Sequence, residues 1–342
     1  MRFKALLGFL GCMSVLGAEP APPASSPPIE WAEIEPLAAQ SLLLGLAAAG
    51  PRLIVVGERG HVLLSDDHGH TWRQAAQVPT RVLLTAVCFA DERHGIAVGH
   101  DETIIASADA GEHWSLAHRA PEALRPLLDV WCGTAGRAIA VGAYMSYFTS
   151  ADYGATWTAR KFQPAAPPMA ATPPAGAKAR DDGGADEGLD YHLNRIVGTR
   201  GGRFYIAAEG GHLYRSDDDA VSWITLPSPY SGSFFGVLPL QGEAVLAFGL
   251  RGHVYRSADA GAHWLAAASG TVALLDDAVP FDGGVALVGL SGAVLTSHDG
   301  GATLVLHQQK DRKGLSAALE VSPGELVVVG EGGARLLGVA AP

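Results

Sequence analysis

One phrase, approximately Ser-x-Asp-x-Gly-x-Thr-Trp, returns six times in this chain of 342 residues. Its copies begin at Ser65, Ser107, Ser150, Ser216, Ser257 and Ser297, and the last ends in Leu304 where the others end in tryptophan. The tryptophans follow one another after 42, 43, 66 and 41 residues. A step of about 40 residues is typical of one four-stranded blade of a β-propeller. This repeat therefore limits the possible folds more than any other feature of the chain.

A second shared phrase precedes each copy and predicts two β-strands joined by a tight turn, as in residues 54–64 and 245–255. An innermost strand before this phrase and an outer strand from the tryptophan make four strands per repeat. In the second repeat we expect them at 83–89, 95–99, 104–107 and from Trp114.

The two ends of the repeat array predict how the ring closes. Residues 326–338 match the two-strand phrase a seventh time, but no outer strand follows them. Residues 29–34 contain Trp31 and alternate apolar and polar positions, as an outer strand does. We expect an all-β, seven-bladed propeller from 29 to 340, with the innermost strand of blade one at 42–48. The N-terminal strand would complete the last blade and remove exposed sheet edges.

The first residues predict export. Arg2 and Lys4 precede an apolar run that ends near Ala18, which is typical of a signal peptide over residues 1–18. The alternative is a lipoprotein signal in which Cys12 is acylated. Two segments rich in Pro and Ala indicate a flexible linker and a disordered insertion between blades three and four, at residues 19–28 and 163–188. The expected location is periplasmic or secreted.

Composition limits the partners and cofactors. A net charge of −11 argues against binding of the nucleic-acid backbone. Outside the leader no apolar stretch reaches the ~20 residues of a membrane helix. Among the 13 histidines, His61, His212 and His253 repeat one position in separate blades. The local groups His68-x-His70 and His100-Asp101-Glu102 lack the spacing of a zinc site, so we expect no metal and no other cofactor.

Two cysteines besides Cys12 occupy adjacent repeats. Cys88 and Cys132 each follow a Leu-Leu pair by four residues. An oxidising compartment permits a disulfide, but equivalent positions on neighbouring inner strands lie too far apart for one. We expect two buried free thiols.

The aspartates of the repeated phrase need no catalytic explanation. Ser and Asp side chains in a turn accept and donate hydrogen bonds within the turn, while glycine supplies the positive φ. We expect a structural role, and no catalytic one, for Asp67, Asp109, Asp152, Asp218, Asp259 and Asp299.

The opposite face of a propeller holds the turns between second and third strands and the connections between blades. Three arginines there lie four residues before a polar residue of an inner strand, at Thr85, Asp129 and Ser316. Arginine and aromatic side chains supply much of the binding energy at protein interfaces. We expect a protein partner on this face, with the candidates Arg59, Arg81, Arg125, Tyr144, Tyr230, Arg251 and Arg312. The alternative is that each arginine pairs with a nearby acidic residue and only solubilises the rim.

The combined phrase Gly-x-x-Gly-x-(Val/Leu/Ile)-(Tyr/Leu)-x-Ser-x-Asp-x-Gly-x-x-Trp resembles the Asp-box propellers of the photosystem II stability and assembly factor family, over residues 31–338. The resemblance implies a non-enzymatic lumenal or periplasmic chaperone. Such a protein docks on a subunit of a membrane complex, partly through an arginine-rich patch. In hosts without a photosystem it implies another envelope complex, such as an exporter. The insertion at 163–188 departs from the compact pattern of that family.

Asp boxes also occur in other secreted propellers, so two alternatives stay open. A sialidase needs three arginines around the substrate carboxylate and a tyrosine nucleophile, which Arg59 or Arg251 near Tyr144 would begin to supply. The Arg-Ile-Pro phrase of sialidases is absent, and the regular repeat favours a scaffold. A glycan-binding propeller would stack sugars on Tyr144, Tyr230 and Phe234.

Overall fold

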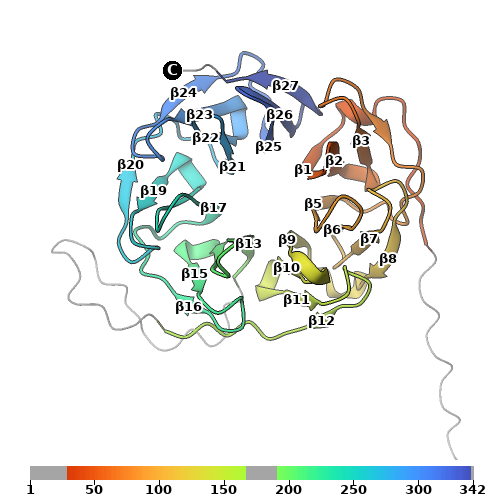
Figure 1. The fold of residues 1–342 in the computed structure, drawn as a ribbon, viewed down its shortest axis with the longest axis horizontal. Helices are drawn as coiled ribbons and strands as arrows, with labels where there is room; N and C mark the ends of the chain where they lie inside the picture. The colour runs from red at the N-terminus through yellow and green to blue at the C-terminus, as the bar shows by residue number, and fades with distance from the viewer. Residues whose placement is uncertain (1–28, 167–190, 340–342) are drawn as a thin grey trace, which may run out of the picture.

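Seven antiparallel sheets surround a central axis in the computed structural model, which describes residues 29–166 and 191–339 (Figure 1). Within each sheet the strands follow one another in sequence order from the axis outwards. The prediction of an all-β, seven-bladed propeller is confirmed. The predicted signal peptide, the linker, Cys12 and all but 163–166 of the predicted insertion lie outside the described residues.

The strand bounds follow the repeat. Blades one to three contain β1 (Leu43–Ala49), β2 (Arg52–Gly57), β3 (Val62–Ser65), β4 (Arg73–Gln74), β5 (Leu84–Phe89), β6 (Gly95–Gly99), β7 (Ile104–Ser107), β8 (Ser115–His118), β9 (Leu127–Cys132), β10 (Ala138–Gly142), β11 (Tyr147–Ser150) and β12 (Thr158–Ala159). Blades four and five contain β13 (Leu193–Gly198), β14 (Phe204–Ala208), β15 (Leu213–Ser216), β16 (Ile224–Thr225), β17 (Phe234–Pro239), β18 (Val245–Gly249), β19 (Val254–Ser257) and β20 (Leu265–Ala267). Blades six and seven contain β21 (Leu275–Phe281), β22 (Gly284–Gly289), β23 (Ala293–Ser297), β24 (Val305–Gln308), β25 (Leu315–Ser322), β26 (Glu325–Gly330) and β27 (Arg335–Gly338).

The helices of the described residues are single 3-10 turns in the loops. They are η1 (Ala38–Gln40), η2 (Glu58–Gly60), η3 (Pro121–Ala123), η4 (Thr134–Gly136), η5 (Ala143–Met145), η6 (Glu209–Gly211), η7 (Leu250–Gly252) and η8 (Leu290–Gly292). None of these short helices has the length or the apolar character needed to cross a bilayer.

The core lies between neighbouring sheets. The second strand of each blade is deeply buried, and every residue of β6, β10, β14 and β18 is buried. Each second strand is covered on both faces, which is why its sequence is a nearly continuous apolar run and does not alternate. Between blades one and two, for example, Ile54 and Val56 pack against Leu84 and Ile105.

The ring closes by packing of blade seven on blade one. Leu43 and Val55 of blade one share an apolar cluster with Val327 and Val329 of blade seven. Blade seven has a sheet of three strands among the described residues. This packing and a backbone hydrogen bond from Ala334 N to Ala39 O at 3.0 Å join it to blade one.

The expectation that an N-terminal strand completes blade seven was wrong. Residues 29–37 form no strand, and they run along the outer side of blade one instead (Figure 1). The backbone N–H of Ala32 donates to the carbonyl of Val78 at 3.0 Å, just after the outer strand of blade one. That strand, β4, has only two residues, so the edge of blade one has room for a further extended segment.

The expectation of two free thiols was also wrong, because Cys88 and Cys132 form a disulfide with a Cα–Cα distance of 5.6 Å. Their positions are not equivalent. The pairing of each inner strand with its second strand makes Leu84 equivalent to Leu127. Cys88 is then equivalent to Trp131, and Cys132 lies one residue further along its strand. Successive side chains of a strand point to opposite faces, so the one-residue offset turns the two sulfur atoms toward each other.

We expect removal of this disulfide to lower the stability of the ring. The variant Cys88→Ala/Cys132→Ala should lose about 2–4 kcal/mol in the free energy of unfolding, because the bond restricts the unfolded chain across 44 residues. Urea unfolding with and without reductant measures the effect, and reductant should destabilise the natural chain but not the variant. Equal unfolding midpoints for the oxidised natural chain and the variant would contradict this expectation.

Candidate protein-binding face

The turns between second and third strands lie on the same face of the ring as the connections between blades. Gly60 N donates to Val82 O at 2.9 Å, and Leu250 N donates to Ser233 O at 3.1 Å, so each turn is bonded to a neighbouring connection. We call this surface the connection face. It consists of the turns at 58–60, 100–103, 143–146, 209–211, 250–252, 290–292 and 331–334 with the connections that lie beside them.

Several side chains of the connection face are carried on backbone that favours glycine. Arg59, Tyr144 and Arg251 occupy equivalent positions in their turns, with φ of 56°, 54° and 58°. In blade four the same position is Gly210, with φ of 62°. A side chain in this left-handed region costs on the order of 1 kcal/mol. Two arginines and a tyrosine are therefore kept where glycine would be more stable, as are Asp101 and Ser291 at the same position of blades two and six.

The predicted partner-binding residues are spread around the ring. Arg59 and Arg81 lie at the junction of blades one and two. The next five junctions, in chain order, have one candidate each: Arg125, Tyr144, Tyr230, Arg251 and Arg312. The three connection arginines were expected to occupy equivalent positions. Leu128, and not Asp129, is equivalent to Thr85 and Ser316, so Arg125 lies one residue away from the position that matches Arg81 and Arg312. A partner that contacts residues on opposite sides of the ring must lie across the middle of the face.

Two of the arginines have ion-pair partners and three do not. Arg81 Nη1 lies 2.8 Å from Glu33 Oε1, and Arg59 Nη1 lies 3.7 Å from Glu35 Oε1, so both partners come from the N-terminal segment. Within the described residues no ion pair is formed by the exposed side chains of Arg125, Arg251 and Arg312. Pairing with acidic neighbours, the alternative to partner binding, therefore applies only to the arginines at the junction of blades one and two.

The aromatic candidates differ in exposure. Tyr144 is 50% exposed, with the ring of His192 5.2 Å away. Tyr230 is half-buried against His253, at 4.3 Å between ring centroids, and Phe234 is completely buried in β17. The row of three aromatic residues that a glycan-binding surface would use is therefore reduced to Tyr144.

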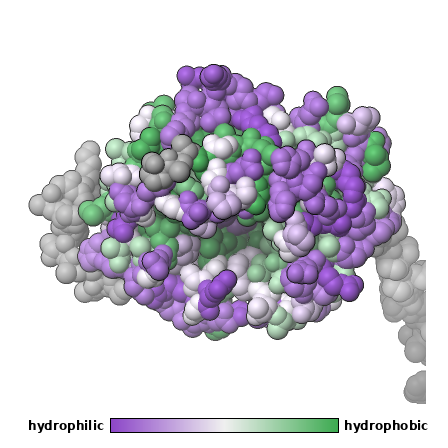
Figure 2. All heavy atoms as spheres, turned by 45° about the horizontal axis from the view of Figure 1, so that its top comes forward, coloured by the Kyte–Doolittle hydropathy of each residue, from purple (hydrophilic) through white to green (hydrophobic). Residues whose placement is uncertain are grey.

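A cavity of about 340 Å³ opens at the central axis on this face. Figure 2 shows the hollow of the ring with hydrophilic residues along its rim and apolar residues deeper inside. Each inner strand contributes its bulged residue to the lining, namely Leu44, Thr85, Leu128, Asn194, Phe235, Asp276 and Ser316. This cavity was not predicted from the sequence. The signal available there was the residue that follows the first apolar residue of each inner strand.

Several charged residues lie in or beside the cavity, and Glu331 of its lining accepts a hydrogen bond from Gly314 N at 2.8 Å. Arg195 is bonded to Asp277 and lies 3.8 Å from Asp129, whose other carboxylate oxygen accepts a hydrogen bond from Ile196 N at 2.8 Å. Asp276 has no hydrogen bond or ion pair with any other residue that the structure describes. Burial raises the pKa of Asp276 to about 7, and the nearby Arg195 opposes that rise.

The repeated turn phrase lies on the other face and bonds to itself. Asp67 Oδ1 accepts hydrogen bonds from Ser65 Oγ at 2.8 Å and from Thr71 N at 2.9 Å. Hydrogen bonds from Thr71 and Ser65 lower the pKa of Asp67 to about 2. The same two bonds, from the serine and from the backbone four residues on, are made by Asp109, Asp152, Asp218, Asp259 and Asp299.

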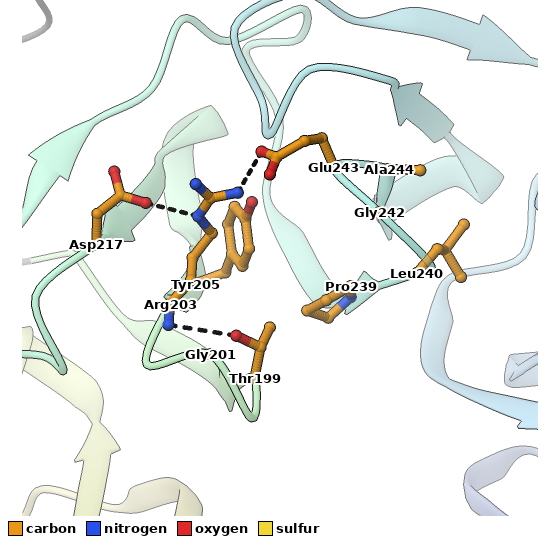
Figure 3. A pocket seen from close by; sticks show the side chains of 10 residues that line it. All are labelled: Thr199, Gly201, Arg203, Tyr205, Asp217, Pro239, Leu240, Gly242, Glu243 and Ala244. Carbon is orange, nitrogen blue, oxygen red and sulfur yellow. Dashed lines mark hydrogen bonds and ion pairs between the residues drawn. The ribbon is translucent and has the colours of Figure 1, made fainter.

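A second cavity, of about 420 Å³, lies between blades four and five on the face of the turn phrases. Figure 3 shows Arg203 between the carboxylates of Asp217 and Glu243. Arg203 Nε donates to Asp217 Oδ1 at 2.6 Å. Both carboxylates are held by one guanidinium across the blade junction, so this cavity contains no free acid and base pair for glycoside hydrolysis.

The arrangement that a sialidase would need is not formed by the expected residues. Arg59, Tyr144 and Arg251 lie in the turns of blades one, three and five, which are not neighbours. The central cavity is lined by a single arginine, Arg195. Within residues 29–166 and 191–339, no three His, Cys, Asp or Glu side chains gather as a metal ion would require.

We expect glycine at position 251 to be more stable than alanine. Arg251→Gly and Arg251→Ala both remove the side chain, but only glycine relieves the left-handed backbone at φ 58°. The glycine variant should therefore exceed the alanine variant by about 1 kcal/mol in the free energy of unfolding. Urea unfolding of both variants tests this, and equal or reversed stabilities would refute it.

We also expect the carboxyl group of Asp276 to make stability depend on pH. Its folded pKa of about 7 lies above its ordinary value of 3.8, so the folded chain holds more protons between these values and loses stability as pH rises toward 7. Asp276→Asn should therefore be more stable than the natural chain at pH 8 by about 1–3 kcal/mol, and by less at pH 5. Asp282→Asn, at an exposed carboxylate of the same blade, is the control in urea unfolding at both pH values. A difference that does not change with pH would contradict the assignment.

Comparison with known proteins supports the fold. No family model matches the chain, and no curated protein matches its sequence. Among solved structures, YCF48 bound to a D1 peptide aligns with 94% of this chain and 99% of its own, at a TM-score of 0.68 and 17% identity. YCF48 from Cyanidioschyzon merolae aligns with 90% of this chain and 98% of its own, at a TM-score of 0.67 and 17% identity. The WD40 β-propeller domain of Doa1 aligns with 86% of this chain and 92% of its own, at a TM-score of 0.63 and 12% identity. At these identities the likeness establishes the propeller fold that the chain shares with them.

Proposed function

We propose that this chain is a non-enzymatic, exported β-propeller scaffold that binds a partner protein across its connection face. The partner is a subunit of a membrane protein complex, bound on its periplasmic or lumenal side while the complex is assembled or stabilised. In a phototroph this complex is photosystem II. In other hosts it is another envelope complex, such as an exporter.

The observation that carries this proposal is the set of unpaired arginines on the connection face. Arg125 and Arg251 are exposed and have no ion-pair partner among the described residues, in a chain with a net charge of −11. Arg251 and the exposed Tyr144 are also held on left-handed backbone. Exposed arginines and tyrosines kept at a conformational cost are suited to an interface.

The complex of YCF48 with a D1 peptide supports the proposal, because there a propeller of the same fold binds a peptide. The disulfide between Cys88 and Cys132 supports export, since such bonds persist in oxidising compartments. The bonding of the turn-phrase aspartates within their own turns supports a role without catalysis.

Site-specific photo-crosslinking tests the proposed face with a matched pair of tyrosines. Tyr144 lies on the connection face and Tyr153 in a turn phrase on the other face; both are exposed and both have left-handed backbone, with φ of 54° and 58°. A photo-crosslinking residue in place of Tyr144, in cells of the source organism, should give a product with one membrane protein. The same residue in place of Tyr153 should not.

The arginines provide the second arm of this experiment. Arg125→Glu/Arg251→Glu should reduce the product from position 144 at least tenfold. Arg93→Glu, on the opposite face, should leave it unchanged. Crosslinking mainly from position 153, or turnover of a fluorogenic glycoside that Tyr144→Phe abolishes, would overturn the proposal.

A further inference from the structure

The N-terminal segment, residues 29–37, is held on blade one as an extended peptide ligand would be. Its backbone is bound by the side-chain amide of Gln74 in β4, which donates to Glu33 O at 2.9 Å and accepts from Glu35 N. A third bond joins Ala32 N to Val78 O at 3.0 Å. These contacts recognise main-chain groups, so they would hold any extended chain of suitable direction.

Two side-chain contacts add selectivity for acidic residues two positions apart. Glu33 pairs with Arg81 at 2.8 Å, and Glu35 pairs with Arg59 at 3.7 Å. All four side chains are well exposed, at 61% and 46% for the first pair and 38% and 65% for the second. Exposed ion pairs of this kind hold weakly and exchange readily.

Apolar burial contributes little to the attachment. Trp31, Ile34 and Leu37 are 46%, 70% and 65% exposed, and Ala32 is the residue of the segment that packs against the core between blades one and two. A segment held by its backbone and by two solvated glutamates can be exchanged for another chain that offers the same groups.

The site also has unused room at the end of the segment. A cavity of about 380 Å³ lies beside Glu35 and Leu37, and Arg59 and His61 are among its lining residues. His61 is 2% exposed, and its Nε2 has no hydrogen-bond partner among the described residues. A longer or more polar side chain than Leu37 would fit here.

We propose that residues 29–37 occupy, in cis, a binding site for an extended acidic segment of the partner protein. They cover Arg59 and Arg81 until a partner segment with carboxylates two residues apart displaces them. This inference rests on the proposed function and deepens it. It explains why two of the connection-face arginines are paired while Arg125, Arg251 and Arg312 are not.

A competition experiment on the full chain tests the proposal. The probe is a fluorescent peptide that copies residues 29–37, Ile-Glu-Trp-Ala-Glu-Ile-Glu-Pro-Leu, with blocked ends. A segment tethered in cis competes at an effective concentration of roughly millimolar. Fluorescence anisotropy should therefore show at least tenfold tighter binding to Glu33→Gln/Glu35→Gln than to the natural chain. The control is Glu30→Gln, which changes a glutamate of the same segment that has no ion pair within the described residues, and it should bind like the natural chain.

Two further arms decide whether the expected groups bind the probe. Adding Arg59→Ser/Arg81→Ser to the double variant should weaken binding at least tenfold. A probe with glutamine at the positions that copy Glu33 and Glu35 should bind the double variant at least tenfold more weakly than the unchanged probe does. Equal binding to the natural chain and to Glu33→Gln/Glu35→Gln, or binding that ignores Arg59 and Arg81, would overturn the proposal. Crosslinking from position 144 would be unaffected by that failure, so the proposed function is judged separately.

Discussion

The whole architecture depends on the packing of each apolar second strand between two neighbouring sheets. A strand such as β10, with every residue buried, cannot be stable in a blade that lacks a neighbour. The ring must therefore close, and it does so where Leu43 and Val55 meet Val327 and Val329. The disulfide between Cys88 and Cys132 adds a covalent link between two blades. The result is a platform whose loops can vary without disturbing the core.

The two faces of this platform use their polar groups differently. On one face the carboxylates are bonded within their own turns, as Asp67 is to Ser65 and Thr71, and Arg203 is bonded to two carboxylates. On the connection face the exposed side chains of Arg125 and Arg251 have no such partner among the described residues. Unpaired charges at a surface are available to a ligand, whereas paired ones contribute to stability. This difference assigns the proposed function to the connection face.

The number of blades and the division into faces were predictable, because a repeat of about 40 residues requires one sheet per period. The disulfide was not predicted, because the Leu-Leu pairs before the two cysteines suggested one register, whereas the strands align Leu84 with Leu127 and set Cys132 one residue further along than Cys88. The alternation in residues 29–34 suits an outer strand and an edge-bound segment equally, and the amide of Gln74 decides between them. The central cavity was missed because its bulged residues share a position but no chemistry.

Hydrogen exchange of the chain, alone and bound to the membrane protein that it crosslinks, tests the central claim most directly. If the partner binds the connection face, exchange should be slower in the turns at 58–60, 143–146 and 250–252 and unchanged in the turn phrase at 65–72. Slower exchange confined to the turn phrases, with the connection face unchanged, would contradict it.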